Sequence, residues 1–412
     1  MKSEEQERMK SRLDESGNQI GVSGSGSKIR ANFSLSSSYD IIFEERMLDP
    51  EVDTLASMIG GRKCMFILSP RVTELYHDLL HSYLQHWLEP AMFSIVTLPV
   101  TEETKTFETA MKMCSVAAEF GLDRKSLFVA MGGGVLMDTV GFAASVYMRR
   151  INFLRIPTTL VGQIDAGVGI KTGVNFGDRK NFIGSFHAPA GVINDSTFLR
   201  TLDPREISNG LSEMVKIAVV SDRGLFDMLH DSRHSLLSSY RSADGRELVR
   251  KINFRSSERM IEQLSDNPYE KELERLVDFG HTFSPFMEVQ SGHRIRHGHA
   301  VALDIALSTE ISSVLGLISD SFYGEIMELL EDIGFTLYDA EVFDAHRMYQ
   351  SLDSITLRRG GRLNLVLPRG DGGATFLRDL SEFRLSTLKS SILRLKERYM
   401  EDGYDGDASS CG

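Results

Sequence analysis

The chain has few cysteines and no long apolar run. Its 412 residues include three cysteines, Cys64, Cys114 and Cys411, without the paired spacing of a disulfide framework or a thiolate metal site. No apolar stretch approaches the roughly 20 residues that span a bilayer, and the first residues are polar and charged, unlike a signal peptide. We therefore expect reduced thiols and a cytoplasmic protein without a membrane partner.

An excess of positive charge is also lacking. The chain has 46 Lys and Arg against 58 Asp and Glu, a net charge of -12 and a pI near 5.5. Phosphate backbones require a concentrated basic face, so this balance argues against a nucleic-acid partner. Any site for an anion must be a local one.

Short apolar runs alternate with amphipathic stretches in the first half of the chain. The pattern predicts strands at residues 64–68, 93–98, 127–131 and 153–156, and helices at about 71–87, 104–120 and 135–148. This order predicts a parallel sheet with helical crossovers. Further helices are expected near residues 208–220, 246–265, 270–290, 297–316, 320–333 and 383–399, with a small strand at 363–367.

The chain is too long for one compact core, which favours two domains. We expect the fold class α/β plus all-α, with an N-terminal parallel-sheet domain over residues 29–200 and a mainly helical domain over 201–398. Residues 1–28 mix charges with Ser and Gly, and residues 399–412 are acidic and glycine-rich. These compositions predict a disordered leader and a disordered tail.

A glycine turn, Gly132-Gly133-Gly134, follows the predicted strand at 127–131 and opens a predicted helix. Backbone N–H groups and the helix dipole favour a phosphate at such a place. The ordinary dinucleotide fingerprint fails, however, because Met137 stands at its third glycine position. Tight packing of the turn is therefore an alternative to pyrophosphate binding.

Polar and charged residues then gather where the strands of a parallel sheet end, the usual place for ligand binding in α/β proteins. Four cations could surround an anionic substrate: Arg149, Lys171, Lys180 and Lys216. Most Lys and Arg side chains are simply solvated, so for each one alone a surface role is the alternative.

Two histidines and one carboxylate form a candidate metal site: Glu213, His281 and His297. Three protein ligands with an open fourth position are typical of catalytic zinc. The spacing matches neither His-x-x-x-His nor His-Glu-x-x-His, and His293 and His299 are competitors for ligation. For His230, His234 and His346 we expect structural or surface roles.

Taken together, the motifs between about residues 39 and 395 resemble the sugar phosphate cyclases, among them dehydroquinate synthase. They are Gly132-Gly133-Gly134 with Asp138, Tyr147-Met148-Arg149, Pro157-Thr158-Thr159-Leu160, Asp165, Lys171-Thr172, Asn175, Lys180-Asn181, Glu213 with Lys216, Gly280-His281-Thr282 and His297-Gly298. The resemblance implies bound NAD⁺, a catalytic divalent metal (Zn²⁺ or Co²⁺), an NAD-binding domain and a metal- and substrate-binding domain. We expect a homodimer that acts on a small sugar phosphate.

The resemblance also implies residue roles. Catalytic roles fall on Lys171, Lys216, Asp165, Asp278, Arg149, Lys180 and Asn181. Cofactor contacts fall on Gly132, Gly133, Gly134, Asp138, Thr158, Thr159, Asp165, Lys171, Lys180 and Thr201, together with Glu102 and Lys105, which match a nicotinamide-binding Glu-x-x-Lys. Ser69 and Arg71 depart from the Asp-x-Asn often found after the first strand, which leaves the adenosine-side ribose contact open.

Three departures from dehydroquinate synthase bear on the substrate. Asp278, Pro285 and Met260 stand where that enzyme has Asn, His and Lys. The motif from Asp278 to Pro285 looks like that of the 2-epi-5-epi-valiolone synthases, which cyclise sedoheptulose 7-phosphate. An aspartate near the substrate would repel the carboxylate of a heptulosonate. The alternative is that these residues only repack the second domain.

The resemblance implies a phosphate-eliminating lyase that works by transient oxidation, phosphate elimination, reduction and intramolecular aldol closure. Other members of the family remain alternatives, namely desmethyl-4-deoxygadusol, 2-epi-valiolone and 3-dehydroquinate synthases. So does a metal-dependent polyol dehydrogenase of the same fold, which would release NADH.

Overall fold

The computed structural model describes residues 12–13, 19–25, 28–32, 36–177, 179–292 and 294–401. The chain divides into two units, Met1–Tyr39 and Asp40–Gly412. In the first unit, an antiparallel sheet joins β1 (Arg12–Leu13), β2 (Gln19–Ser25) and β3 (Lys28–Asn32). These strands differ from the expected disordered leader. The other residues of the expected leader, and residues 402–412 of the expected tail, lie outside the described residues.

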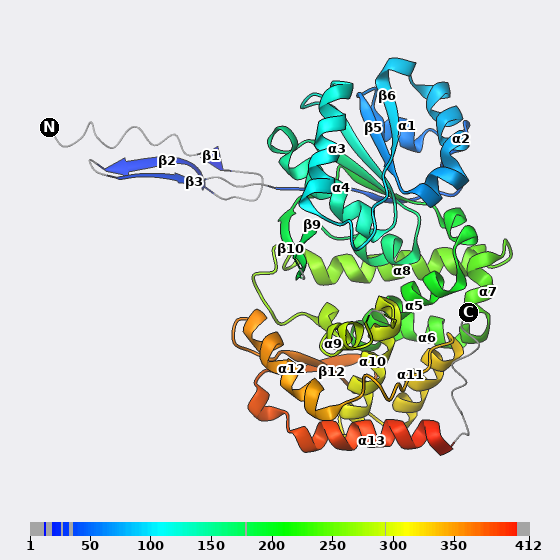
Figure 1. The fold of residues 1–412 in the computed structure, drawn as a ribbon, viewed down its shortest axis with the longest axis vertical. Coiled ribbons are helices and arrows are strands. Elements are labelled where there is room, and N and C mark those ends of the chain that lie inside the picture. Colours follow the sequence, from blue (N-terminus) through cyan, green and yellow to red (C-terminus); the bar gives the residue numbers. More distant parts are fainter. Residues whose placement is uncertain are drawn as a thin grey trace. The chain divides into compact units, whose positions relative to one another are not determined.

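A six-stranded parallel sheet forms the N-terminal half of the second unit (Figure 1). Its order is β4 (Ile41–Phe43), β11 (Gly191–Asn194), β8 (Asn152–Pro157), β7 (Leu127–Gly132), β5 (Cys64–Leu68) and β6 (Phe93–Thr97). Every residue of β5 and β7 is buried, as expected for a parallel sheet covered on both faces. The four predicted strands are confirmed. The edge strand β4 and its neighbour β11 were missed because runs of three or four residues show little periodicity.

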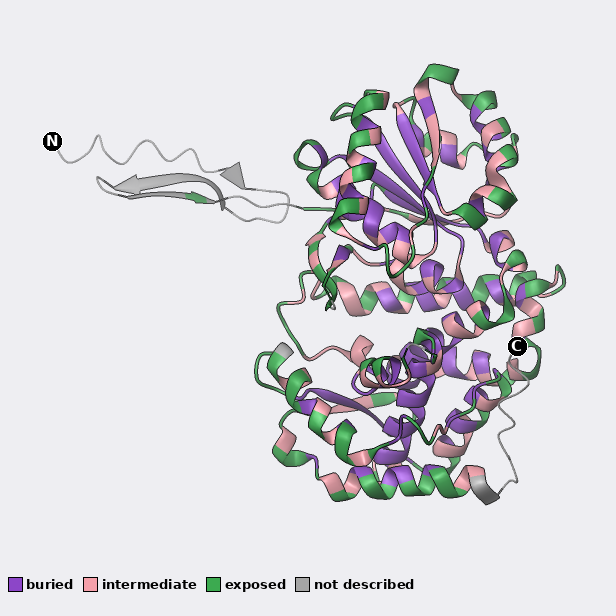
Figure 2. Ribbon diagram, viewed as in Figure 1, coloured by how far each residue is buried: buried purple, intermediate pink, exposed green. Residues whose placement is uncertain are grey.

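Helices pack on both faces of this sheet, and their inward sides are buried (Figure 2). One apolar cluster includes residues of α1 (Thr54–Ile59) and α2 (Pro70–Trp87). The other includes residues of α3 (Phe107–Phe120) and α4 (Gly134–Val146). The three helices predicted from the sequence in this half correspond to α2, α3 and α4.

The polar insert between β8 and β11 is more regular than the sequence suggested. It begins with a short π-helix, η3 (Gly162–Ala166), and continues as an antiparallel hairpin of β9 (Lys171–Phe176) and β10 (Arg179–Phe186). π-helical turns are rare and often occur at functional sites. Both segments carry residues that the sequence marked as functional.

The C-terminal half is mainly helical around one large apolar cluster. Two long helices, α5 (Pro204–Ser221) and α10 (His297–Val314), are buried along most of their length. The other elements are α6 (Arg223–Asp231), α7 (Leu236–Arg241), α8 (Arg246–Ser265), α9 (Ser284–Gln290), α11 (Asp320–Asp332), α12 (Ala345–Arg358), α13 (Leu385–Glu401) and a hairpin of β12 (Leu365–Arg369) and β13 (Gly373–Leu377). Among the described residues, none of the helices is long and apolar enough to cross a membrane.

One helix prediction was wrong over most of its length. The expected helix at 270–290 is a loop followed by the short α9, because the backbone takes left-handed φ angles at Glu270 (51°) and Gly280 (73°). The small strand near residue 365 is confirmed as β12. The predicted domain boundary at residues 200–201 stays a prediction.

Candidate active site

The three predicted metal ligands come together from three separate elements. Glu213 lies on α5 and is completely buried, and His297 is the first residue of α10. His281 lies in the loop before α9, directly after Gly280 in its left-handed conformation. These residues are distant in sequence, so tertiary packing of the helical half creates the site.

The spacing of the three side chains fits one divalent cation. The Nε2 atoms of His297 and His281 lie 3.1 Å and 3.8 Å from the Oε1 atom of Glu213, and one donor atom from each residue lies within 4.8 Å of the others. Tetrahedral zinc with bonds of about 2.1 Å places its ligand atoms about 3.4 Å apart. An N,N,O set at this spacing fits a catalytic metal with an open position.

Each imidazole is oriented by a bond on its other nitrogen. His281 donates from Nδ1 to the backbone oxygen of Phe279 at 3.1 Å, and the Nδ1 of His297 donates to the Glu288 carboxylate at 3.0 Å. Both Nε2 atoms therefore point towards Glu213. Such outer partners fix the tautomer and the ring orientation of metal-binding histidines.

The charges of the site suit a cation. Burial raises the pKa of Glu213, but Lys216, His281 and His297 lower it more, so that its pKa lies well below the ordinary value. Burial and the neighbouring Lys216 lower the pKa of His281. Burial lowers the pKa of His297, whereas bonds to Glu213 and Glu288 raise it, to about 10. An ionised Glu213 and neutral imidazoles are the metal-binding forms, so His281 is already in its binding form and His297 loses a proton when a cation binds.

Lys216 connects the metal ligands to the polar insert. Its ammonium lies 2.5 Å from Oε2 of Glu213, one turn earlier on α5, and 3.4 Å from the carboxylate of Asp165 on η3. The Lys216 side chain is only 3% exposed. Burial lowers its pKa, but Asp165 and Glu213 raise it more. A fixed cation thus lies beside the candidate metal site.

Two neighbouring residues of β10 join the metal centre to the glycine turn. Lys180 binds Glu288, the partner of His297, at 2.9 Å. The side chain of Asn181, whose φ of 52° is left-handed, accepts a bond of 2.5 Å from Lys105. Lys105 is buried and also binds Asp138 on α4, at 2.6 Å. The hairpin therefore links the helix that follows the glycine turn with an outer partner of the metal site.

The glycine turn is closely packed, and it also leaves the start of α4 without a side-chain cap. A Cβ atom at Gly133 would lie 3.2 Å from Thr159, and one at Gly134 would lie 3.0 Å from Ala166, so the turn is closely packed. Gly133 is also the N-cap of α4 and provides no side-chain cap. The first N–H groups of α4 therefore have no side-chain cap, which fits an anionic group of a nucleotide.

The remaining cofactor candidates lie in several places. Glu102 accepts a bond from Asn175 at 2.9 Å, beside Asn181, whose backbone N–H binds Asn175 at 2.8 Å. Thr158 is buried and its backbone N–H donates to Gly132. Thr201 is bonded to the Tyr76 hydroxyl at 2.8 Å. No contact brings Thr201 to the Lys105 group within the described residues.

Asp278 and Lys171 belong to another ionic group. Asp278 is paired with Arg275, and the Arg359 guanidinium lies 3.8 Å away. Glu270 binds Lys171 at 2.6 Å and also pairs with Arg275. Asp278 is thus a paired carboxylate, so the repulsion expected of it is smaller than that of a free charge.

The structure does not bring Arg149 into these clusters. It lies in a turn in which Met148, Arg149 and Arg150 all have left-handed φ angles of 48°, 65° and 100°. Its side chain makes no hydrogen bond or ion pair with any described residue. Its expected contact with the substrate stays a prediction.

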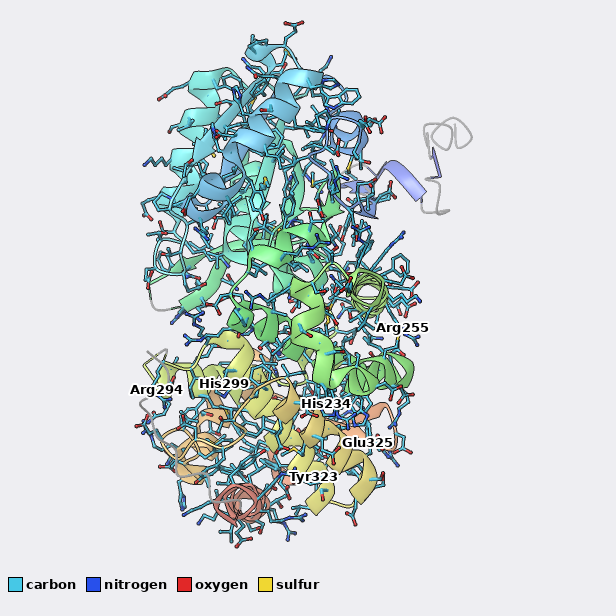
Figure 3. All side chains as sticks on the ribbon, turned by 90° about the vertical axis from the view of Figure 1, so that its right-hand side faces the viewer. His234, Arg255, Arg294, His299, Tyr323 and Glu325 are labelled. Atoms are coloured by element: carbon cyan, nitrogen blue, oxygen red, sulfur yellow. The ribbon has the colours of Figure 1, made fainter. Side chains whose placement is uncertain are left out.

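Of the two histidines that compete for ligation, the structure describes His299, which has another partner. His299, which is labelled in Figure 3, lies next to the metal site in sequence. Its Nε2 donates to the backbone oxygen of Thr336 at 2.9 Å. His234 is largely exposed and lies 3.4 Å from Asp332. His293 lies outside the described residues.

Sequence reasoning missed Glu288, Glu270, Arg275 and Arg359. Glu288 could have been suspected, because it lies between the two metal-binding histidines in sequence and carboxylates often orient such histidines. Burial raises the pKa of Glu288, but His297 and Lys180 lower it, to about 2. The other three residues lie in irregular segments, and no motif marks them.

Comparisons with known proteins show which family the chain belongs to. The family descriptions "3-dehydroquinate synthase N-terminal" and "3-dehydroquinate synthase C-terminal" match residues 95–209 and 210–354. A 2-epi-5-epi-valiolone synthase of Streptomyces glaucescens is 40% identical over 354 residues, covering 86% of this chain and 90% of that protein. A demethyl-4-deoxygadusol synthase of Trichormus variabilis is 33% identical over 372 residues, covering 89% and 90%.

A solved structure of a 2-epi-5-epi-valiolone synthase also matches the fold of this chain. ValA, a 2-epi-5-epi-valiolone synthase from Streptomyces hygroscopicus subsp. jinggangensis 5008 with NAD⁺ and Zn²⁺ bound, superposes with a TM-score of 0.83. It is 34% identical, and the match covers 90% of this chain and 99% of that one. The chain belongs to the 3-dehydroquinate synthase family of sugar phosphate cyclases.

Proposed function

We propose that this protein cyclises sedoheptulose 7-phosphate to 2-epi-5-epi-valiolone and releases phosphate, using NAD⁺ and Zn²⁺ or Co²⁺. One observation supports the use of the cofactor and the metal on the same substrate. Lys180 and Asn181 are adjacent on β10. Lys180 contacts an outer partner of the metal ligands, and Asn181 contacts Lys105, which lies beside α4. The expected homodimer is part of the proposal, and light scattering of the purified protein checks it.

The chemistry explains why a cofactor and a metal belong together. The carbon that bears the phosphate is bonded to a carbon whose C–H bond is unactivated, so phosphate leaves slowly. The hydroxyl on the other neighbour of that C–H carbon must first become a ketone, which acidifies the proton and places the phosphate β to the carbonyl. When bound, NAD⁺ would take up and return a hydride, and the divalent cation would polarise substrate oxygens. Reduction of the ketone, ring opening and aldol closure follow, without net redox change.

The residues of this chain divide the work of binding. Glu213, His281 and His297 would hold the cation, and α4 with Lys105 and Asp138 would receive the nucleotide. Lys216, fixed between Glu213 and Asp165, would donate hydrogen bonds to substrate oxygens beside the metal.

Lys171 is the cation that we assign to the phosphate group. It is partly exposed, and its present partner is the Glu270 carboxylate. A phosphate could replace this carboxylate. Arg149 is the second cation proposed for this role.

Two replaced side chains support a heptulose rather than a heptulosonate as substrate. Met260 is 1% exposed on α8, and Pro285 lies in the first turn of α9. Neither offers the cation or imidazole that would bind a substrate carboxylate. Asp278 is a carboxylate and supplies no positive charge, and its pairing with Arg275 offsets its negative charge.

The test compares two substrates with the NAD⁺- and zinc-loaded protein. Sedoheptulose 7-phosphate should give phosphate and 2-epi-5-epi-valiolone, identified by NMR, whereas 3-deoxy-arabino-heptulosonate 7-phosphate should react poorly. Efficient dehydroquinate formation from the second substrate, with no cyclitol from the first, would overturn the assignment.

The same samples separate the remaining alternatives. Demethyl-4-deoxygadusol from sedoheptulose 7-phosphate would identify the cyclase activity for which one of the relatives is named. Accumulation of NADH without phosphate release would identify a polyol dehydrogenase.

A further inference from the structure

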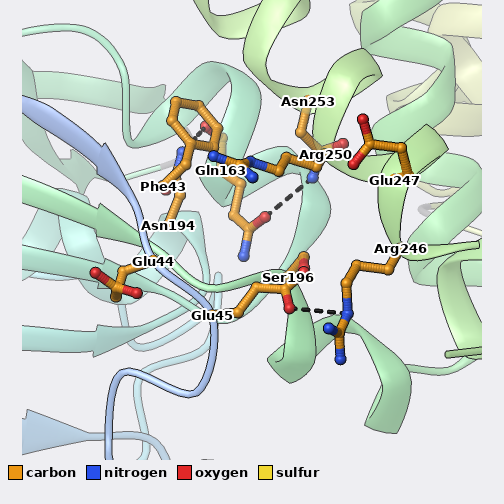
Figure 4. A pocket seen from close by; sticks show the side chains of 10 residues that line it. All are labelled: Phe43, Glu44, Glu45, Gln163, Asn194, Ser196, Arg246, Glu247, Arg250 and Asn253. Atoms are coloured by element: carbon orange, nitrogen blue, oxygen red, sulfur yellow. Dashed lines mark hydrogen bonds and ion pairs between the residues drawn. The ribbon is translucent and has the colours of Figure 1, made fainter. Parts of the chain in front are cut away.

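A cavity of about 230 Å³ is lined by residues of β4, β11, η3 and α8 (Figure 4). A single buried water needs roughly 10–15 Å³, so this cavity can hold a small molecule. None of its lining residues has been assigned above to the metal, the cofactor or the substrate. Its floor consists of three amides, Gln163, Asn194 and Asn253, and we call it the amide cavity.

The floor of the amide cavity is a hydrogen-bonded network in which one side-chain oxygen is unpaired. The exposed fractions of Gln163, Asn194 and Asn253 are 1%, 2% and 1%. Asn253 donates to the Gln163 side chain at 3.2 Å, and Asn194 donates to the Gln163 backbone oxygen at 3.0 Å. The Oδ1 atom of Asn194 has no hydrogen-bond partner among the described residues. Buried polar atoms are almost always paired, so this oxygen lacks the donor that such an atom ordinarily has.

The rim of the amide cavity provides further groups on exposed turns of α8. Arg250 has no hydrogen bond or ion pair with any described residue, and in Figure 4 its side chain reaches towards the ring of Phe43. Glu247 lies one turn earlier on the same helix. A cation, carboxylates, an amide oxygen and an aromatic wall together offer the donors and acceptors that hydroxyl groups use.

The charge of the lining discriminates between ligand classes. Three carboxylates stand against two guanidiniums, namely Glu44, Glu45 and Glu247 against Arg246 and Arg250. Arg246 is already paired with Glu45 at 2.9 Å. The net negative charge of the lining would repel a phosphorylated molecule but not an uncharged one.

We propose that the amide cavity binds an uncharged cyclic polyol, with one hydroxyl donating to Asn194 and others bonded to Arg250 and Glu247. The product released by the proposed reaction belongs to this class, and that identification rests on the proposed function. Gln163 lies on η3 two residues before Asp165, which contacts Lys216 at 3.4 Å. The cavity therefore adjoins the segment that carries Asp165.

Calorimetric titration of the NAD⁺- and zinc-loaded protein tests the site. The probes are myo-inositol, the purified dephosphorylated product, and inositol monophosphate as the charged comparison. Arg250→Ala and Glu247→Gln change exposed residues of α8, and Arg347→Ala on α12 is the matched control, because Arg347 is also exposed and its side chain has no described partner. Thermal unfolding confirms that the variants fold.

We expect an uncharged polyol to bind wild type and Arg347→Ala equally, and to bind Arg250→Ala about tenfold more weakly, the effect of one hydrogen bond to a charged group. Equal affinity in Arg250→Ala, tighter binding of the monophosphate, or no binding of either uncharged probe would overturn the proposal. The titration needs no turnover, so its failure is distinguishable from failure of the proposed function.

Discussion

Replacement of Glu288 should weaken metal binding although Glu288 is not a ligand. Its carboxylate accepts the Nδ1 hydrogen of His297 at 3.0 Å and is itself held by Lys180 at 2.9 Å. Loss of such an outer partner typically lowers metal affinity 10–100-fold, or about 1.4–2.8 kcal/mol. That range agrees with the roughly 1.5–3 kcal/mol expected of a hydrogen bond to a charged group.

The assay is competition of the metal-free protein with a chromophoric chelator for Zn²⁺. Glu288→Ala should lose the full factor, and Glu288→Gln should lose less, because the amide oxygen can still accept from Nδ1. Glu341→Ala is the control, since Glu341 is an exposed carboxylate paired with Arg294. Wild-type zinc affinity in Glu288→Ala, with His297 still required, would refute the reasoning that the carboxylate orients the ligand.

Three further outcomes are expected. Gly133→Val should reduce NAD⁺ affinity at least tenfold, measured by fluorescence titration, because its side chain would crowd Thr159 at the start of α4; normal binding would contradict this. Lys216→Ala should lower kcat/KM for sedoheptulose 7-phosphate by about 100-fold or more, and an unchanged value would remove its proposed substrate contact. Asp222→Ala should cost about 2–3 kcal/mol in urea unfolding, because Asp222 caps α6 and binds Arg255 and Arg259. Burial raises the pKa of Asp222, but the bond from Arg255 helps to lower it overall. The contribution of Asp222 to the free energy of unfolding is therefore present above the unfolded pKa of about 3.9 and is lost as pH falls through the lower folded value. An equal difference in unfolding free energy between wild type and variant at pH 7 and pH 2 would contradict this.

The sequence predicted those parts of the fold whose signal is local. The buried strands β5 and β7 are continuous apolar runs, and a glycine turn opens α4, so both the sheet and the position of the turn were readable. The loop before α9 could not be predicted from such a local signal. Its amphipathic pattern is helical, but left-handed backbone at Glu270, supported by ion pairs with Lys171 and Arg275, breaks the helix.

The candidate site was predictable to the extent that motifs mark it. Gly-His pairs and Glu213 were found from the sequence, and the structure brings them together. Glu288 and the pairing of Asp278 with Arg275 depend on how a loop and a short helix fold back on the site. Such contacts have no spacing rule, so the sequence could not show that Arg275 offsets the charge of Asp278.

Zinc titration of the metal-free protein tests the central claim most directly. Wild type and the control His299→Ala should each bind one Zn²⁺ at the site, since His299 is bonded to Thr336 rather than to the ligand group. His281→Ala should lose most of this binding, because it removes one of three converging ligands. Full zinc occupancy in His281→Ala would contradict the assignment of Glu213, His281 and His297 as the metal site.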